Sequence, residues 1–261
     1  MVESEFLPCH TCMHCKAKRT GPGHLGVELH RNAAQPLALV CGDLAGPMRT
    51  LGIDGNRFAF VLVDVYTSMV WTLPLKAKSA APEQFKKWLI KVNADSPALY
   101  NVRRFHSDNG GEFTSESFGS VCLDFKITQT FSNADEPRQN PYAERAIGTL
   151  NSLALTSMTT GNMPMSLWWR AQSNASTVLN AFPKQGETVS PYGLYYQQVP
   201  DMSLLAPFGC YIVGYRAKKL NSVDPKWHPG SIKGTYIRSC SLKEKVGYAL
   251  MTEDWSVYYC V

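Results

Sequence analysis

The fold of this chain is decided by the stretch LVCGDLAGP at residues 39–47, a short β-rich run that ends in an acid and a turn. Two further β-rich runs follow at 57–65 and 68–75, and turn signals such as Asp-Gly-Asn divide them. This pattern predicts three consecutive strands that pair antiparallel. We expect the first of them to span 37–43, so that Asp43 stands at its end.

Strands and helices alternate further along the chain. Amphipathic or short helices are predicted at 82–92, 115–125 and 166–182, and a fourth and a fifth strand at 100–106 and 126–131. Short β-rich runs return after residue 200. Five strands with interleaved helices, followed by a small group of strands, predict an α/β core with a small C-terminal β module.

Two more acids stand at positions that suit a metal site. Asp108 lies in HSDNGGEF at 106–113 and Glu144 in QNPYAER at 139–145, with 35 residues between the two acids. Mg²⁺ and similar ions take oxygen ligands, and a two-metal phosphoryl-transfer centre needs several carboxylates around ions roughly 3.5–4 Å apart. Together with Asp43 the pair forms a candidate metal site. The plainer alternative is three unrelated surface acids.

The sequence around these acids would hold them in place. Gly110 and Gly111 allow a tight turn and the close approach of a phosphate. Asn140 is a good N-cap and Pro141 suits the first helical position, so we expect a helix to about residue 158. His106 stands beside Asp108, but a histidine at a strand end is more often packing or polar filler than a catalytic base.

These motifs, in this order and spacing, resemble the catalytic core of retroviral and retrotransposon integrases, the D,D-35-E group. The copia-type branch is indicated by FVLVDVYTSMVWTLPLKAKS at 60–79, SLWWRAQSNASTVLNAFP at 166–183 and PFGCYIVGY at 207–215. The resemblance covers roughly 36–215. It implies a ribonuclease H-like five-stranded mixed sheet flanked by helices.

The resemblance also implies the chemistry. Two Mg²⁺ or Mn²⁺ ions would be bound, with Asp43 on both ions, Asp108 on one and Glu144 on the other. The expected activity is metal-dependent cleavage of element ends and strand transfer into target DNA. The partners would be double-stranded DNA, from the element ends and the target, and further copies of the chain. The protein would act in the nucleus and be cytoplasmic before import.

Four residues are expected to contact DNA: Asn140, Arg145, Lys218 and Lys219. Net charge is +5, and residues 214–245 carry eight basic side chains against two acidic ones, so a C-terminal patch would attract phosphate.

The helix after Glu144 departs from the pattern of the family. Relatives usually carry an Asn and a basic residue where this chain has Ile147 and Gly148, and a basic residue where it has Leu155. Helical spacing places Gly148 and Asn151 on the face of Glu144, and both are neutral. We therefore expect weaker DNA binding. The alternative is a degenerate or domesticated, non-catalytic integrase-like domain that binds DNA.

The N-terminal cysteines resemble half of the zinc site that precedes integrase cores. Cys9 and Cys12 would supply two of the four ligands that a structural Zn²⁺ needs. Spacing also allows His24 and His30 to complete a finger, although no hydrophobic pattern of a finger lies between. A zinc-dependent nucleic-acid adaptor is thus a third hypothesis, and an incomplete remnant without metal is favoured.

The predicted domains are a partial zinc-knuckle remnant with a linker at 1–35, the core at 36–200 and a basic β-rich module at 201–261. No membrane span is visible, because the most apolar stretch, 58–71, contains an acid. We expect the chain to be a piece of a longer polyprotein.

Overall fold

The computed structural model describes residues 33–96, 100–132, 140–215, 231–242, 245–253 and 257–260. The chain divides into two compact units. One unit comprises residues 20–151 and 175–200. The other comprises residues 1–19, 152–174 and 201–261. Among the described residues, no helix is long and apolar enough to cross a membrane.

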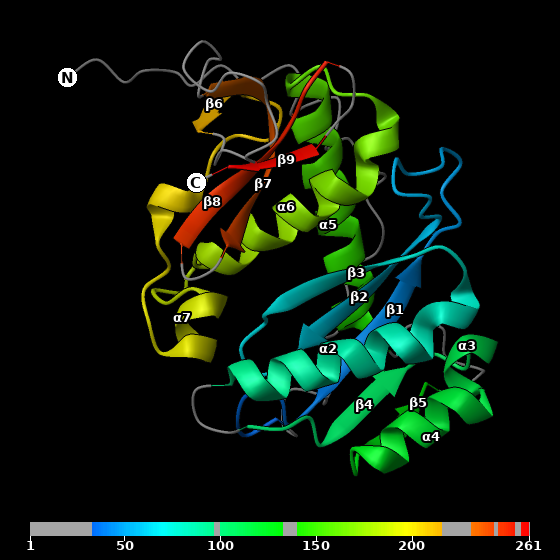
Figure 1. Cartoon of the computed structure of the whole chain (residues 1–261). Coiled ribbons are helices and arrows are strands. Elements are labelled where there is room, and N and C mark those ends of the chain that lie inside the picture. The colour runs from blue at the N-terminus through cyan, green and yellow to red at the C-terminus, as the bar shows by residue number, and fades with distance from the viewer. Residues whose placement is uncertain are drawn as a thin grey trace. The chain divides into compact units, whose positions relative to one another are not determined.

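The unit that contains residues 20–151 is built on a five-stranded mixed sheet (Figure 1). Its strands are β1 (Val40–Ala45), β2 (Phe58–Asp64), β3 (Val70–Leu75), β4 (Arg104–Ser107) and β5 (Thr128–Phe131). They lie in the order β3-β2-β1-β4-β5, with β1, β2 and β3 antiparallel and β4 and β5 parallel to β1. The antiparallel trio and the mixed sheet predicted from the sequence are therefore confirmed.

The helices also follow the predicted pattern, with two additions. They are α2 (Ala81–Asp95), α3 (Gly111–Thr114), α4 (Glu116–Asp124), α5 (Pro141–Thr160), α6 (Trp168–Ala181) and α7 (Pro191–Tyr196). The short helices α3 and α7 were not predicted. The Ser190 hydroxyl caps α7 by accepting a hydrogen bond from the Gly193 amide, and Pro191 stands at its first position. This Ser-Pro pair is the sequence signal that would have found α7.

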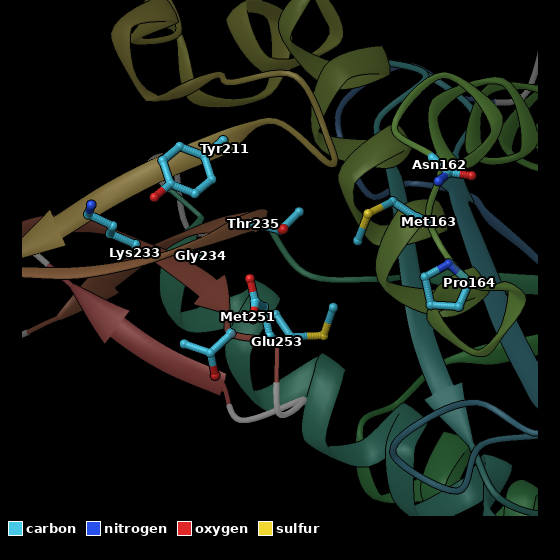
Figure 2. Close-up of a pocket in the computed structure, with 10 residues that line it drawn as sticks. Asn162, Met163, Pro164, Tyr211, Lys233, Gly234, Thr235, Met251 and Glu253 are labelled. Carbon is cyan, nitrogen blue, oxygen red and sulfur yellow. The ribbon is translucent and has the colours of Figure 1, made fainter.

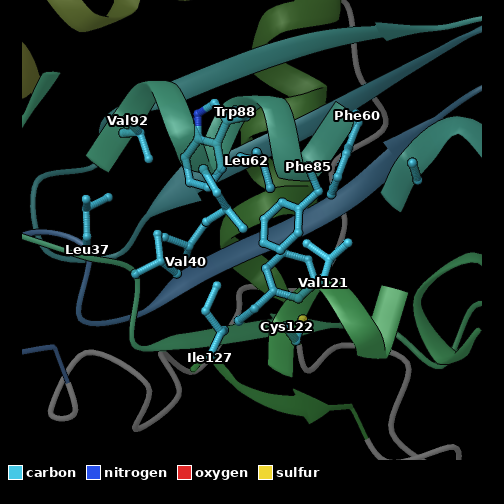
Figure 3. Packing of buried hydrophobic residues seen from close by; sticks show 14 of the residues in the cluster. Leu37, Val40, Phe60, Leu62, Phe85, Trp88, Val92, Val121, Cys122 and Ile127 are labelled. Carbon is cyan, nitrogen blue, oxygen red and sulfur yellow. The ribbon is translucent and has the colours of Figure 1, made fainter. Parts of the chain in front are cut away.

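An aromatic core fills one face of the five-stranded sheet. Rings from the strands, such as Phe60 and Phe105, pack against Phe85 of α2 and Phe118 of α4 with centroid distances of 4.8 to 6.5 Å. Figure 3 shows the aliphatic residues that extend this core along α2 and α4. Burial of so much apolar surface fixes β1 and β4, the two strands that carry Asp43 and lead into Asp108.

The other face of the sheet packs against the start of α5. Ala143 is fully buried in a small cluster with Leu39, Cys41 and Val65, and Tyr142 covers its side. Side chains alternate between faces along a strand. Asp43 therefore lies on the same face as Cys41, the face that α5 covers.

A four-stranded antiparallel sheet belongs to the other unit. Its strands are β6 (Tyr211–Tyr215), β7 (Ser231–Leu242), β8 (Lys245–Met251) and β9 (Val257–Cys260), in that order. The predicted C-terminal β module is confirmed, with β9 as an unpredicted fourth strand. The stretch 152–174 groups with this sheet rather than with the core.

Candidate active site

Asp43 lies in the middle of the sheet, where its strand is held on both sides. Its neighbour Gly42 packs against the aromatic core, and a Cβ at that position would stand 2.6 Å from the Phe105 ring and 2.9 Å from the Phe60 ring. Only glycine fits there. The Asp43 side chain faces away from this core and is half-buried, and its carboxylate accepts one hydrogen bond, 2.7 Å long, from the Leu44 amide.

Asp108 follows β4 directly, as predicted. Its side chain is exposed and its Oδ1 accepts a hydrogen bond from the Gly110 amide, 3.1 Å long. Ser107, just before it, is fully buried. The acid therefore stands on a fixed strand end while its carboxylate meets solvent.

Glu144 lies one turn into α5, which begins at Pro141 as predicted. The side chain of Asn140 differs from the prediction, since it does not cap the helix. Its amide Nδ2 donates to the Gly42 carbonyl at 2.9 Å, and its Oδ1 is buried without a partner in the described structure. Asn140 is 3% exposed, and its hydrogen bond to Gly42 ties the start of α5 to β1, beside Asp43.

The three acids are close enough to act on each other electrostatically. Burial raises the pKa of Asp43 to about 6, against an opposing effect of the Leu44 amide, and the negative charges of Asp108, Glu144 and Glu112 raise it further. Burial and nearby negative charges both disfavour the ionised form of Asp43, and a bound cation would favour it. Glu112 was quoted in the motif around Asp108 but was not predicted as a site residue.

The carboxylates are near one another but are not arranged as a ligand shell. Among the described residues, no three His, Cys, Asp or Glu side chains stand close enough to hold one ion. The electrostatic effect on Asp43 and the lack of a ligand shell are compatible, because charges interact over several ångströms whereas a metal–oxygen bond to Mg²⁺ is about 2.1 Å long. Asp43 and Asp108 each direct an oxygen to a local amide instead. The donor set, all carboxylate oxygen, suits Mg²⁺ or Mn²⁺.

His106 is held by hydroxyl groups on both sides of its ring. Its Nδ1 is 3.0 Å from the Thr130 hydroxyl and its Nε2 is 3.3 Å from the Ser132 hydroxyl, and the residue is buried. These contacts join β4 to β5 and its end. The packing role expected from the sequence fits this geometry better than that of a base.

Two of the residues predicted to bind DNA are described. Asn140 is buried, as above, and Arg145 is exposed on α5. Arg145 has a basic neighbour in Lys184. The pKa of Lys184 is lowered, mainly by burial of its ammonium group and also by the charge of Arg145, and the charge of Glu187 opposes this. Lys184 is otherwise solvent-exposed, so the pair offers positive charge one residue beyond Glu144.

The remaining predictions fall outside the described residues. These are the predicted zinc ligands Cys9 and Cys12 and the predicted DNA contacts Lys218 and Lys219.

A cavity of about 650 Å³ lies in the unit of the four-stranded sheet (Figure 2). It is lined by the loop at 162–164, by residues of the sheet such as Tyr211 and Lys233, and by Glu253, which follows β8. None of the predicted site residues lines it. Lysine and glutamate of opposite charge stand at its wall, so it has no single electrostatic character.

The fold and the site together define a class. A mixed sheet in the order β3-β2-β1-β4-β5, with acids on β1, just after β4 and on the helix after β5, is the ribonuclease H-like arrangement. The particular family follows from the sequence: residues 33–137 match the family model described as integrase core domain. This segment is therefore similar to integrase core domains, in agreement with the sequence motifs.

Relatives and a solved structure agree with this assignment. The chain is 27% identical over 204 residues to the Retrovirus-related Pol polyprotein from transposon TNT 1-94 of Nicotiana tabacum, covering 78% of the chain and 15% of that protein. It is 28% identical over 212 residues to that from transposon RE2 of Arabidopsis thaliana, covering 79% of the chain and 14% of that protein. The chain thus spans about one seventh of these curated relatives. The intasome of simian T-cell lymphotropic virus, solved with the PP2A regulatory subunit B56 gamma, shares the fold with a TM-score of 0.52, at 17% identity over 97% of this chain and 84% of that one.

Proposed function

We propose that the chain is the catalytic part of a copia-type retrotransposon integrase, which cuts and joins double-stranded DNA with two divalent ions. The observation that carries this proposal is that Asp108, at the end of β4, and Glu144, on α5, are near enough to Asp43 on β1 for their charges to raise its pKa. The similar proteins are Pol polyproteins of plant transposons, which supports a role in DNA integration. Such an activity would place the protein on chromosomal DNA in the nucleus.

The residues at the site fit that chemistry. Divalent ions bound there would lower the pKa of an attacking water or 3′-hydroxyl and would stabilise the charge on the leaving oxygen. Asp43, on the rigid strand, and the exposed carboxylates of Asp108 and Glu144 would hold the ions. Arg145 and Lys184 would hold a DNA phosphate beside Glu144. A second copy of the chain would carry the other element end.

A non-catalytic integrase-like domain is the second candidate, and one observation favours it. Gly148 and Asn151 leave the face of α5 beyond Glu144 without positive charge. Phosphate contacts supply much of the affinity of proteins for DNA. A chain with this face could keep the acids and the fold and yet hold its substrate too weakly to cut it.

The test is the variant Asp108→Asn. We expect Mn²⁺- or Mg²⁺-dependent nicking and joining of short duplex DNA by the wild type, and a loss of at least about a hundredfold in the variant. Asp124→Asn is the matched control, since Asp124 is an exposed acid on α4 of the same unit. Circular dichroism would show that both variants fold. Equal cleavage by wild type and Asp108→Asn, or none by either, would reject the catalytic proposal and favour the second candidate.

A further inference from the structure

Glu112 adds a fourth carboxylate beside the three acids. It lies on the short helix α3, which starts three residues after Asp108. Its side chain is only 10% exposed, and its negative charge contributes to the raised pKa of Asp43. A glutamate buried to this degree needs a reason, because acidic side chains are almost never buried without a partner.

Glu112 and Asp108 converge over Gly110. A Cβ on Gly110 would stand 3.0 Å from Asp108 Oδ1, 3.0 Å from Glu112 Cδ and 3.1 Å from Glu112 Oε2. The backbone of Gly110, with φ of −56°, would accept any residue, so the space for two carboxylates explains the glycine better than its conformation does. Oε2 of Glu112 therefore faces the same small space as the Asp108 carboxylate.

The other oxygen of Glu112 is neutralised. Oε1 is 2.9 Å from Nζ of Lys78, which lies on the 3-10 helix η2 (Lys78–Ala80) and is 50% exposed. This pair links the segment before α2 to the loop that carries Asp108. A second pair of the same unit, Lys86–Asp124 at 3.3 Å, joins α2 to α4 but is about half-exposed at both ends and does not touch the site.

We propose that Glu112 is a positioning residue of the metal centre, which acts through Asp108 and sets the affinity for divalent cations, with Lys78 as its counter-charge. This inference rests on the proposed function, because it assumes that Asp43, Asp108 and Glu144 hold the cation. Glu112 Oε2 stands beside the Asp108 carboxylate, whose Oδ1 is held by the Gly110 amide, so it limits where that carboxylate can turn and adds negative charge near the ion. Lys78 offsets part of that charge until the ion binds.

The proposal predicts opposite effects for the two partners of one ion pair. Glu112→Gln removes a negative charge at constant shape and should weaken Mn²⁺ binding by about tenfold, the scale of changes around a metal's ligands. Lys78→Met removes a positive charge from the site and should tighten Mn²⁺ binding by about threefold, as expected for one charge removed at several ångströms. A pair that only fastened the loop would weaken binding in both variants.

The experiment is calorimetric titration of the full 261-residue chain with Mn²⁺ alone, which needs no DNA and no turnover. Lys86→Met and Asp124→Asn serve as the matched pair and should leave the Mn²⁺ affinity unchanged. Thermal unfolding of each variant in EDTA reports on folding. If Glu112→Gln does not fold, the tightening by Lys78→Met still decides the proposal.

Asp108→Asn separates this inference from the proposed function. Loss of Mn²⁺ binding in Asp108→Asn, with Glu112→Gln weaker and Lys78→Met tighter than wild type, supports both. The role of Glu112 alone is overturned if Asp108→Asn loses Mn²⁺ binding but Glu112→Gln or Lys78→Met binds Mn²⁺ as the wild type does. It is also overturned if both of these variants bind Mn²⁺ more weakly. Unchanged binding in Asp108→Asn overturns the metal centre itself.

Discussion

Two aspartates stand on neighbouring strands of one sheet and differ in what surrounds them. Asp64 ends β2 and is fully buried, and its carboxylate accepts hydrogen bonds from the Leu37 amide, the Thr67 amide and the Thr67 hydroxyl at 2.6 to 3.0 Å. Asp43 on β1 accepts one hydrogen bond and has three acids near it. Burial raises the pKa of both.

The difference teaches how to separate a structural acid from a functional one. Donors that converge on Asp64 satisfy its oxygens and link β2 to its own turn and to the residues before β1. The surroundings of Asp43 leave one oxygen without a donor and add negative charge, which a cation would relieve. A raised pKa alone does not distinguish them, whereas the hydrogen-bond partners do.

The largest effect is expected at the structural acid. Asp64→Asn would place an amide donor against the Thr67 donors or the Leu37 amide, and leaving buried donors unpaired should cost about 2 kcal/mol of unfolding free energy. Relief of the buried charge offsets part of the cost but not all of it. Urea unfolding at pH 7.5 measures the change. A more stable variant would contradict the structural role given to Asp64.

Asp43, the proposed metal ligand, should respond to substitution in the opposite way. The native pKa of Asp43, about 6, lies above its ordinary value of 3.8, so the native state binds more protons between these values. The contribution of Asp43 is fully present below pH 3.8 and is lost as pH rises through 6. Asp43→Asn removes the ionised group and should stabilise the metal-free protein by about 1–2 kcal/mol at pH 7.5, after allowance for solvent screening.

Unfolding in EDTA at pH 7.5 and at pH 4 checks this prediction. The gain from Asp43→Asn should be present at pH 7.5 and small at pH 4, where wild-type Asp43 is largely neutral. With Mn²⁺ added, the wild type should gain stability and the variant should not. A loss of stability on substitution at pH 7.5 would make Asp43 a second structural acid and would end the comparison.

Local rules in the sequence predicted where Asp108 and Glu144 lie in the fold, whereas the role of the three acids as one site was implied by the family resemblance and stays a prediction. A β-rich run predicted Asp43 at the end of a strand, which was wrong in its bounds because β1 runs from Val40 to Ala45 and contains Asp43. An Asn-Pro pair placed Glu144 one turn into α5. Glu112 was missed since its relevance depends on Lys78, 34 residues away. The side-chain direction of Asn140 was missed because local propensity favours a cap and the carbonyl of Gly42 lies 98 residues away.

Asn140 offers a way to sharpen the comparison, because it ties the strand of Asp43 to the helix of Glu144. Asn140→Ala removes one buried hydrogen bond and should cost about 1 kcal/mol of unfolding free energy. Asn140→Asp replaces the donating Nδ2 by an oxygen, so this variant should also lose the bond to the Gly42 carbonyl, and it adds a charge. Urea unfolding of both variants measures the cost. An effect below about 0.3 kcal/mol for Asn140→Ala would mean that the bond does not hold α5 in solution.

The smallest effect concerns DNA rather than the acids. Gly148 lies one turn beyond Glu144, where Lys would add a phosphate contact, so Gly148→Lys should tighten duplex DNA binding by about threefold and steepen its salt dependence by about one ion. Lysine also favours a helix over glycine by up to about 1 kcal/mol, which alone could tighten binding by ordering α5. Gly119→Lys controls for that gain, because Gly119 lies within α4 and a Cβ there meets nothing within 4 Å. Fluorescence anisotropy at several salt concentrations separates a new phosphate contact from a gain in helix stability. A steeper salt dependence of DNA affinity in Gly148→Lys alone would place DNA along the Glu144 face of α5. Equal salt dependence in the two variants would place DNA elsewhere.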